Sequence, residues 1–132
     1  MREIKFRAWS KEHDFIGKVY EIDFRYGLVK LETEKETTHT FGISNVELMQ
    51  YTGLKDKSGK EIYEGDVVTT IHTDHAPHIG EVYFQPTRLN WSVKHGSLTN
   101  QDMFVYSRPD CSIEVIGNIY ETPELLNPTD KD

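Results

Sequence analysis

The stretch that decides the fold is Leu48-Met49-Gln50-Tyr51-Thr52-Gly53-Leu54-Lys55-Asp56-Lys57-Ser58-Gly59-Lys60-Glu61-Ile62-Tyr63-Glu64-Gly65-Asp66-Val67-Val68. Its centre, 56–59, predicts a turn, because aspartate can accept hydrogen bonds from its own backbone and glycine takes a positive φ without strain. The flanking residues, Tyr51–Leu54 and Lys60–Tyr63, then pair as two short strands. Glu64-Gly65-Asp66 turns the chain again and leads into a longer apolar strand, Val67–Thr73. In this interpretation Glu64 and Asp66 form the turn and are not a catalytic pair of carboxylates.

Alternation of apolar and polar residues, the pattern of a half-buried strand, also dominates the rest of the chain. Further strands are therefore predicted over Glu3–Trp9, Phe15–Phe24, Gly27–Glu32, Ile79–Gln85, Asn90–His95, Met103–Tyr106 and Ser112–Tyr120. Arg25-Tyr26-Gly27 predicts the turn of a hairpin. The polar segment Lys30–Thr40 is interpreted as a solvated loop or an exposed strand.

Helix signals are confined to two short segments. Ser44-Asn45-Val46-Glu47 matches the capping box, in which Ser caps a helix and Glu lies three positions later, so a helix is predicted over Ser44–Gln50. Pro123 suits the first turn of a second short helix, which would end at Leu126. The residues from Pro128 onward are expected to fray.

These patterns predict a mainly β protein with a minor helical part. Two architectures fit them: a small curled sheet, or an SH3-like or OB-like barrel with an N-terminal β extension and short helices. A chain of 132 residues is enough for one domain, so a single domain is expected over 1–132. Residues 1–50 would form the N-terminal β segment and short helix, 51–122 the barrel-like core, and 123–132 the last helix and tail.

Three segments of the chain together resemble a known protein family. They are the stretch 48–68 quoted above, Met1–Trp9 at the start, and Glu114–Glu121 near the end. Their order and spacing are similar to those of the YopX family, small proteins encoded mostly by bacteriophages and prophages. The resemblance covers most of the chain, but it implies no activity and no site residue that could be transferred to it.

Composition limits the classes of function. The formal net charge of -7 repels phosphate backbones and disfavours nucleic-acid binding. No apolar run approaches the ~20 residues of a membrane-spanning helix, and the charged N-terminus does not resemble a signal peptide. Cys111 is the sole cysteine, so no internal disulfide can form. We therefore expect a cytoplasmic protein, within the host cell, that does not associate with membranes.

A cluster of potential metal ligands lies between two predicted strands. Four such side chains occur within seven residues: His72, Asp74, His75 and His78. However, residues three apart on a strand face opposite sides, and Pro77 disfavours a helix that would bring them together. We therefore favour a solvated hairpin tip, with a metal site as a lesser hypothesis.

A second candidate surface would bind nucleic acid, which requires cations beside exposed rings. The cations that lie near Phe6, Trp9 and Tyr51 are Lys5, Arg7, Lys55, Lys57 and Lys60. Ordinary strand alternation, with rings inward and cations outward, explains the same pattern and agrees better with the acidic chain.

No catalytic or cofactor-binding residue is predicted. The chain has no phosphate-binding glycine loop and no nucleophile elbow, and Cys111, at the start of an apolar strand, is interpreted as a structural thiol. We expect a non-enzymatic, phage- or prophage-encoded binding or assembly module without a cofactor, which forms a homo-oligomer and can bind a host or phage protein. Two alternatives stay open: an accessory protein that binds nucleic acid, and a metal-dependent enzyme that uses His72, His75 and His78.

Overall fold

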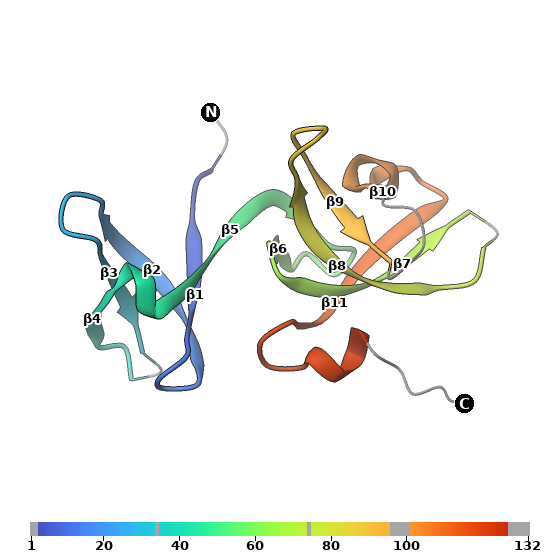
Figure 1. Cartoon of the computed structure of the whole chain (residues 1–132). Helices are drawn as coiled ribbons and strands as arrows, with labels where there is room; N and C mark the ends of the chain where they lie inside the picture. Colours follow the sequence, from blue (N-terminus) through green and yellow to red (C-terminus); the bar gives the residue numbers. More distant parts are fainter. Residues whose placement is uncertain (1–2, 34, 74, 96–100, 127–132) are drawn as a thin grey trace. The chain divides into compact units, whose positions relative to one another are not determined.

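The computed structural model describes residues 3–33, 35–73, 75–95 and 101–126, and it confirms that the protein is mainly β (Figure 1). The contacts within the chain divide it into two compact units, Met1–Tyr51 and Thr52–Asp132. Each unit has a hydrophobic core of its own. That the two units behave as one domain stays a prediction.

The first unit is an antiparallel sheet with the strand order β4-β3-β2-β1-β5. The strands are β1 (Phe6–Ser10), β2 (Phe15–Asp23), β3 (Leu28–Glu32), β4 (Thr38–Gly42) and β5 (Val46–Lys55), the last of which continues into the second unit. The buried core consists of small and branched side chains from β1, β3 and β5, namely Ala8, Val29, Leu31 and Val46.

The turn between β2 and β3 confirms the prediction for Arg25-Tyr26-Gly27. The Asp23 carboxylate accepts hydrogen bonds from the amides of Arg25 (2.9 Å) and Tyr26 (3.0 Å). Gly27 has a φ of 65°, which glycine adopts without strain. The polar segment beyond β3 then returns as the exposed strand β4, one of the two interpretations of Lys30–Thr40.

The helix predicted over Ser44–Gln50 is wrong. Only a single 3-10 turn, η1 (Ile43–Asn45), is formed there, and no side chain caps it. From Val46 the chain is instead strand β5, which pairs with β1 from Ser10↔Val46 to Phe6↔Gln50. Pairing with β1 buries Val46 in the core, and this tertiary gain outweighs the local capping pattern.

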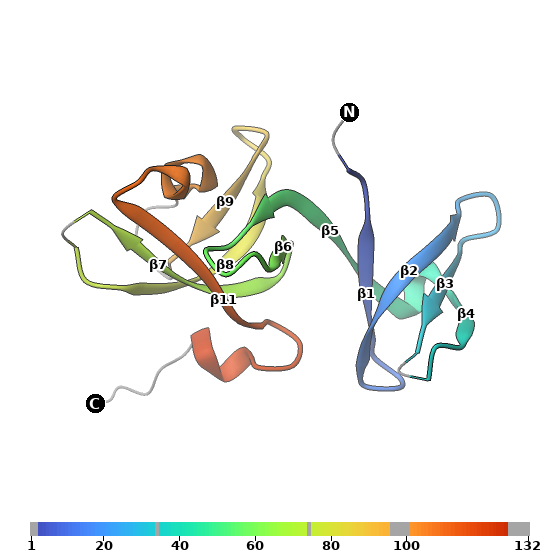
Figure 2. The ribbon, with the colours of Figure 1, turned by 180° about the vertical axis from the view of Figure 1, so that it is seen from behind.

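The second unit contains β6 (Glu61–Tyr63), which lies beside the end of β5, and a five-stranded antiparallel sheet in the order β10-β9-β8-β7-β11. The bounds of the five strands are β7 Asp66–His72, β8 His78–Gln85, β9 Asn90–Lys94, β10 Gln101–Asp102 and β11 Cys111–Asn118. The sheet curls (Figure 1, Figure 2), but β10 and β11 end it without pairing with each other. The curled-sheet alternative is therefore confirmed, and the sheet does not close into a barrel.

The strand predicted over Met103–Tyr106 is also wrong, because this segment forms the 3-10 helix η2 (Met103–Ser107). Asp102 caps it by accepting a hydrogen bond from the Phe104 amide at 2.9 Å. The helix buries Met103, Val105 and Tyr106, two of which, Met103 and Tyr106, belong to the core of this unit.

The second predicted helix is present as the short 3-10 helix η3 (Pro123–Leu126). The tail predicted from Pro128 lies outside the described residues. The core of the second unit is formed by Ile62, Val68, Val82, Val93, Met103, Tyr106 and Ile113.

Gly59 and Gly65 are expected to be sensitive to substitution because their φ angles are +87° and +88°. Replacing either by Val should lower the free energy of unfolding by about 1–3 kcal/mol, since a branched side chain is strained at such angles. An added Cβ at Gly59 would meet no atom within 4 Å, so the backbone angle alone causes the loss there.

Gly59→Asn is the matched control, because asparagine tolerates a positive φ better than valine does. Thermal unfolding of the three variants measures the effect. Equal melting temperatures for wild type and both Val variants would contradict the predicted strain at Gly59 and Gly65.

Candidate functional site

The turn between β5 and β6 is hydrogen-bonded to β11. Oδ1 of Asp56 accepts hydrogen bonds from the amides of Ser58 and Lys60, each at 2.9 Å, and Oδ2 accepts one from the Val115 amide at 2.9 Å. The Lys57 amide adds a bond to the Ile113 carbonyl at 3.0 Å. The turn at the centre of the quoted stretch therefore occupies the outer edge of β11.

The Asp56 carboxylate is held in its charged form. Burial by itself raises the pKa of Asp56, but the hydrogen bonds from Val115, Lys60 and Ser58 outweigh it, so the pKa lies below its ordinary value. Asp66 is also buried and accepts a bond from the Tyr63 amide at 2.8 Å. Both aspartates of the quoted stretch thus bond the backbone of turns, as the turn interpretation of Asp66 predicts.

The histidine cluster lines a hollow of about 300 Å³ in the second unit. The ring centroids of His72 and His75 are 5.5 Å apart, and those of His78 and His95 are 5.8 Å apart. Nδ1 of His75 lies 2.8 Å from the His72 carbonyl oxygen. Because a carbonyl can only accept, Nδ1 of His75 is the donor in this bond. Asp74 lies outside the described residues.

Within the part of the chain that the structure describes, no three His, Cys, Asp or Glu side chains are grouped closely enough to hold a metal ion. A metal site at His72, Asp74, His75 and His78 therefore stays a hypothesis from the sequence alone.

The hollow also has polar lining residues. Thr70 forms a hydrogen bond with Nε2 of His95 at 2.9 Å and another with the Tyr106 hydroxyl. Burial raises the pKa of Tyr106. The sequence pattern did not indicate His95, because that residue reaches the hollow from the end of another strand.

Cys111 is half-buried and lies directly opposite His72 in the pairing of β11 with β7. Its Sγ is 3.7 Å from Oδ1 of Asp110. This position at the start of β11 fits the structural thiol that the sequence suggests.

The candidate nucleic-acid residues fall into the two separate units. In the second unit, Lys55, Lys57 and Lys60 are exposed on or beside the β5–β6 turn, and Lys57 pairs with Glu114 at 3.6 Å. In the first unit, Lys5 pairs with Glu3 at 3.3 Å. Part of this positive charge is therefore balanced by neighbouring carboxylates.

The aromatic rings near these cations are too buried for a nucleic-acid base to stack on them. Tyr51 is 5% exposed, and Phe6 and Trp9 are half-buried. Nε of Arg7 contacts the Met49 sulfur at 3.4 Å. Since single-stranded nucleic acid binds to exposed ring faces, this arrangement fits strand alternation better than a nucleic-acid surface.

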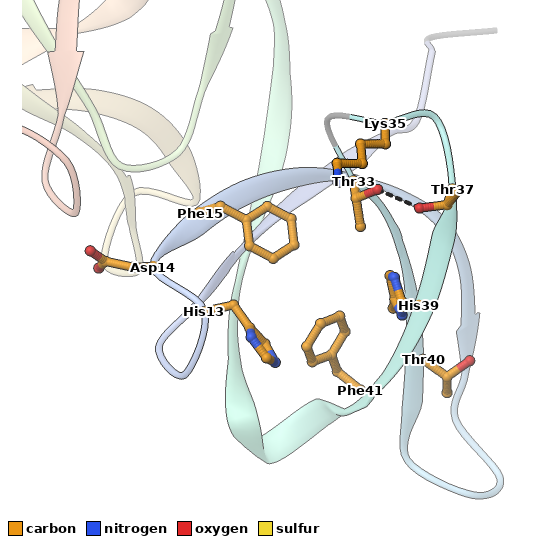
Figure 3. A pocket seen from close by; sticks show the side chains of 9 residues that line it. All are labelled: His13, Asp14, Phe15, Thr33, Lys35, Thr37, His39, Thr40 and Phe41. Carbon is orange, nitrogen blue, oxygen red and sulfur yellow. Dashed lines mark hydrogen bonds between the residues drawn. The ribbon is translucent and has the colours of Figure 1, made fainter.

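A larger hollow, of about 590 Å³, lies in the first unit (Figure 3). Its lining residues are His13, Asp14, Phe15, Thr33, Lys35, Thr37, His39, Thr40 and Phe41. Figure 3 shows the rings of Phe15 and Phe41 side by side within it, with centroids 6.3 Å apart, while Asp14 points away. The His13 ring meets Phe41 edge-on at 5.6 Å. Sequence reasoning missed this hollow, since its residues come from two segments that lie far apart in the chain, 13–15 and 33–41.

The β4 edge, which we define as the side of Thr38–Gly42 that faces away from β3, borders this hollow. β4 ends the strand order of its sheet, and none of the strands that the structure describes pairs with this side. Proteins protect exposed edges with proline, charged side chains or bulges. β4 has the sequence Thr-His-Thr-Phe-Gly and pairs with β3 without a register shift, so it carries none of these devices.

Comparisons with known proteins agree with this architecture. A family model described as YopX protein matches residues 5–127. The crystal structure of protein EF1440 from Enterococcus faecalis is similar to this chain, with a TM-score of 0.64 and 25% sequence identity over 96% of this chain and 99% of that one. No curated protein matches the chain.

Among the described residues, no helix has the length and apolarity needed to cross a membrane.

The match to the family model spans nearly the whole chain and includes the quoted stretch 48–68. The resemblance carried by the three sequence segments is thus confirmed, and the chain belongs to the YopX family.

Proposed function

We propose that this chain is a non-enzymatic binding or assembly module, encoded by a phage or prophage, that works in the cytoplasm of the host cell as a homo-oligomer. The observation that carries the proposal is the unprotected β4 edge. Unpaired backbone groups along such an edge favour pairing with a strand of another chain. Membership of the YopX family supports the phage origin, because that family is encoded mostly by bacteriophages and prophages.

The use of the carboxylates in the quoted stretch supports a non-enzymatic role. Asp56 and Asp66 are buried and accept hydrogen bonds from backbone amides, so their oxygens hold turns together. A general base instead needs access to substrate and a pKa near the working pH, whereas the pKa of Asp56 is lowered.

Two exposed rings support contact with a further protein, of host or phage origin. Phe24 and Tyr26, in the turn between β2 and β3, are 81% and 67% exposed. Aromatic side chains are enriched at the centre of protein interfaces because each ring covers a large area. The β2–β3 turn is therefore the surface that we assign to such a partner.

Self-association is the direct test of the proposal. Light scattering at micromolar concentrations should give a mass above the 15.4 kDa of one chain. Since each chain carries a formal charge of -7, added salt should screen repulsion between copies and leave the association intact or stronger. A mass of one chain at every concentration and at both low and high salt would contradict the proposal.

A further inference from the structure

The β4 edge and the hollow of the first unit form one continuous surface. His39 and Phe41 pair with Leu31 and Val29 of β3, and residues directly opposite in a sheet point to the same face. Leu31 and Val29 are fully buried in the core, so His39 and Phe41 lie on the core face. The hollow is therefore the place where the core of this unit opens at the end of its sheet.

We propose that a second copy of this chain closes the hollow, by antiparallel pairing of the two β4 strands about a twofold axis at Thr40. The inference rests on the self-association proposed above and adds the surface and the register. Pairing at a sheet edge supplies main-chain hydrogen bonds, while the flanking hollow accepts side chains from the added strand.

The register follows from the length and pattern of β4. Thr40 is the middle residue of Thr38–Gly42, so an axis there brings all five residues of each strand into pairing. Thr40 then faces Thr40 of the second copy, and Thr38 faces Gly42. A slip by one residue would place threonines opposite rings and mismatch the two core faces.

The same register matches the chemistry of the hollow. His39 would lie opposite Phe41 of the second copy, and Phe41 opposite its His39, both on the core face. These pairs would extend the ring cluster in which Phe41 already contacts His13 and Phe15. Aromatic pairs across strands stabilise a sheet, and the threonines on the other face can bond each other.

Charge on β4 does not oppose pairing with a second copy. β4 has no Asp, Glu, Lys or Arg, although the whole chain carries a formal charge of -7. Like charges directly opposite each other destabilise paired strands. Pairing along β4 brings none together, so two acidic chains can meet at this edge.

Cross-linking tests the register. In a Cys111→Ser background, Thr40→Cys should form a covalent dimer on mild oxidation, because opposite Cβ atoms lie about 4.5–5.5 Å apart, close to disulfide geometry. Thr38→Cys is the matched control, on the same strand and the same face. It would lie four residues from its counterpart, about 13 Å along the strand, and should cross-link at least tenfold more slowly.

A charge pair gives a second measurement. Thr40→Glu would place two carboxylates opposite each other and should weaken dimerisation at least tenfold, while Thr38→Glu would face glycine and weaken it less. Both positions are exposed, so circular dichroism should show an unchanged fold. If the protein is an oligomer but the variants at positions 38 and 40 have equal effects, pairing of the β4 strands is contradicted and self-association is not. A monomer at all concentrations would overturn both.

Discussion

Asp56→Ala is expected to lower the free energy of unfolding by about 3 kcal/mol. The substitution removes the acceptor of three backbone amides, those of Ser58, Lys60 and Val115. A buried donor left without an acceptor costs about 1–3 kcal/mol, and water can reach the exposed turn more easily than the Val115 amide. Urea unfolding, with the slope checked against wild type, measures the change.

Two further variants test whether the loss of stability comes from the missing carboxylate acceptor. Asp56→Asn keeps one carbonyl oxygen but turns an NH₂ group toward an N–H donor, so its loss should be intermediate. Ser58→Ala changes an exposed side chain of the same turn and leaves its backbone amide in place, so stability should stay within about 0.5 kcal/mol of wild type. A loss for Asp56→Ala no larger than that of Ser58→Ala would show that the turn does not hold β11.

At low pH, the wild-type protein should no longer have a higher free energy of unfolding than Asp56→Asn. The pKa of Asp56 is lower in the folded protein than its ordinary value of about 3.9. Its contribution is therefore fully present above pH ~4 and is lost as the pH falls through the folded pKa. The stability difference between wild type and Asp56→Asn should shrink below pH ~4, and a constant difference down to pH 2 would contradict the role of the charge.

This turn shows what the sequence can predict. The Asp56-to-Gly59 turn and the two flanking strands follow from local chemistry, since the bonds to Ser58 and Lys60 close within four residues. The bond to Val115 spans 59 residues, and no local pattern indicates it. Most strands were predictable for the same reason, and a curled sheet was one of the two architectures expected, but the order in which the strands pair was not predictable.

The errors arose where one local pattern was compatible with two structures. Ser44 and Glu47 match a capping box, yet the same segment alternates well enough to pair with β1, and burial of Val46 decides between the two. Sequence reasoning also grouped His72, His75 and His78 as neighbours in the chain but missed His95, which reaches the hollow through tertiary pairing of β8 with β9. Sites assembled from several strands have no sequence spacing to detect.

Leu31→Ala is expected to destabilise the whole chain, although the contacts divide it into two units. Leu31 is fully buried in the first unit, and such a truncation costs about 2–5 kcal/mol. That unit spans 51 residues, a size at which a core by itself is marginal. β5 runs unbroken from Val46 to Lys55 across the boundary at Tyr51, so loss of its pairing with β1 should also disturb its pairing with β6.

The two tryptophans allow each unit to be observed separately, because Trp9 lies in the first and Trp91 in the second. Fluorescence of the single-tryptophan variants Trp9→Phe and Trp91→Phe should give coincident unfolding transitions, and Leu31→Ala should shift both equally. Ile62→Ala, which truncates a fully buried side chain of the second unit, is the matched control and should do the same. If Leu31→Ala moved the transition seen by Trp9 and not that seen by Trp91, the chain would be two domains. Coincident transitions are the signature of one cooperative domain over residues 1–132.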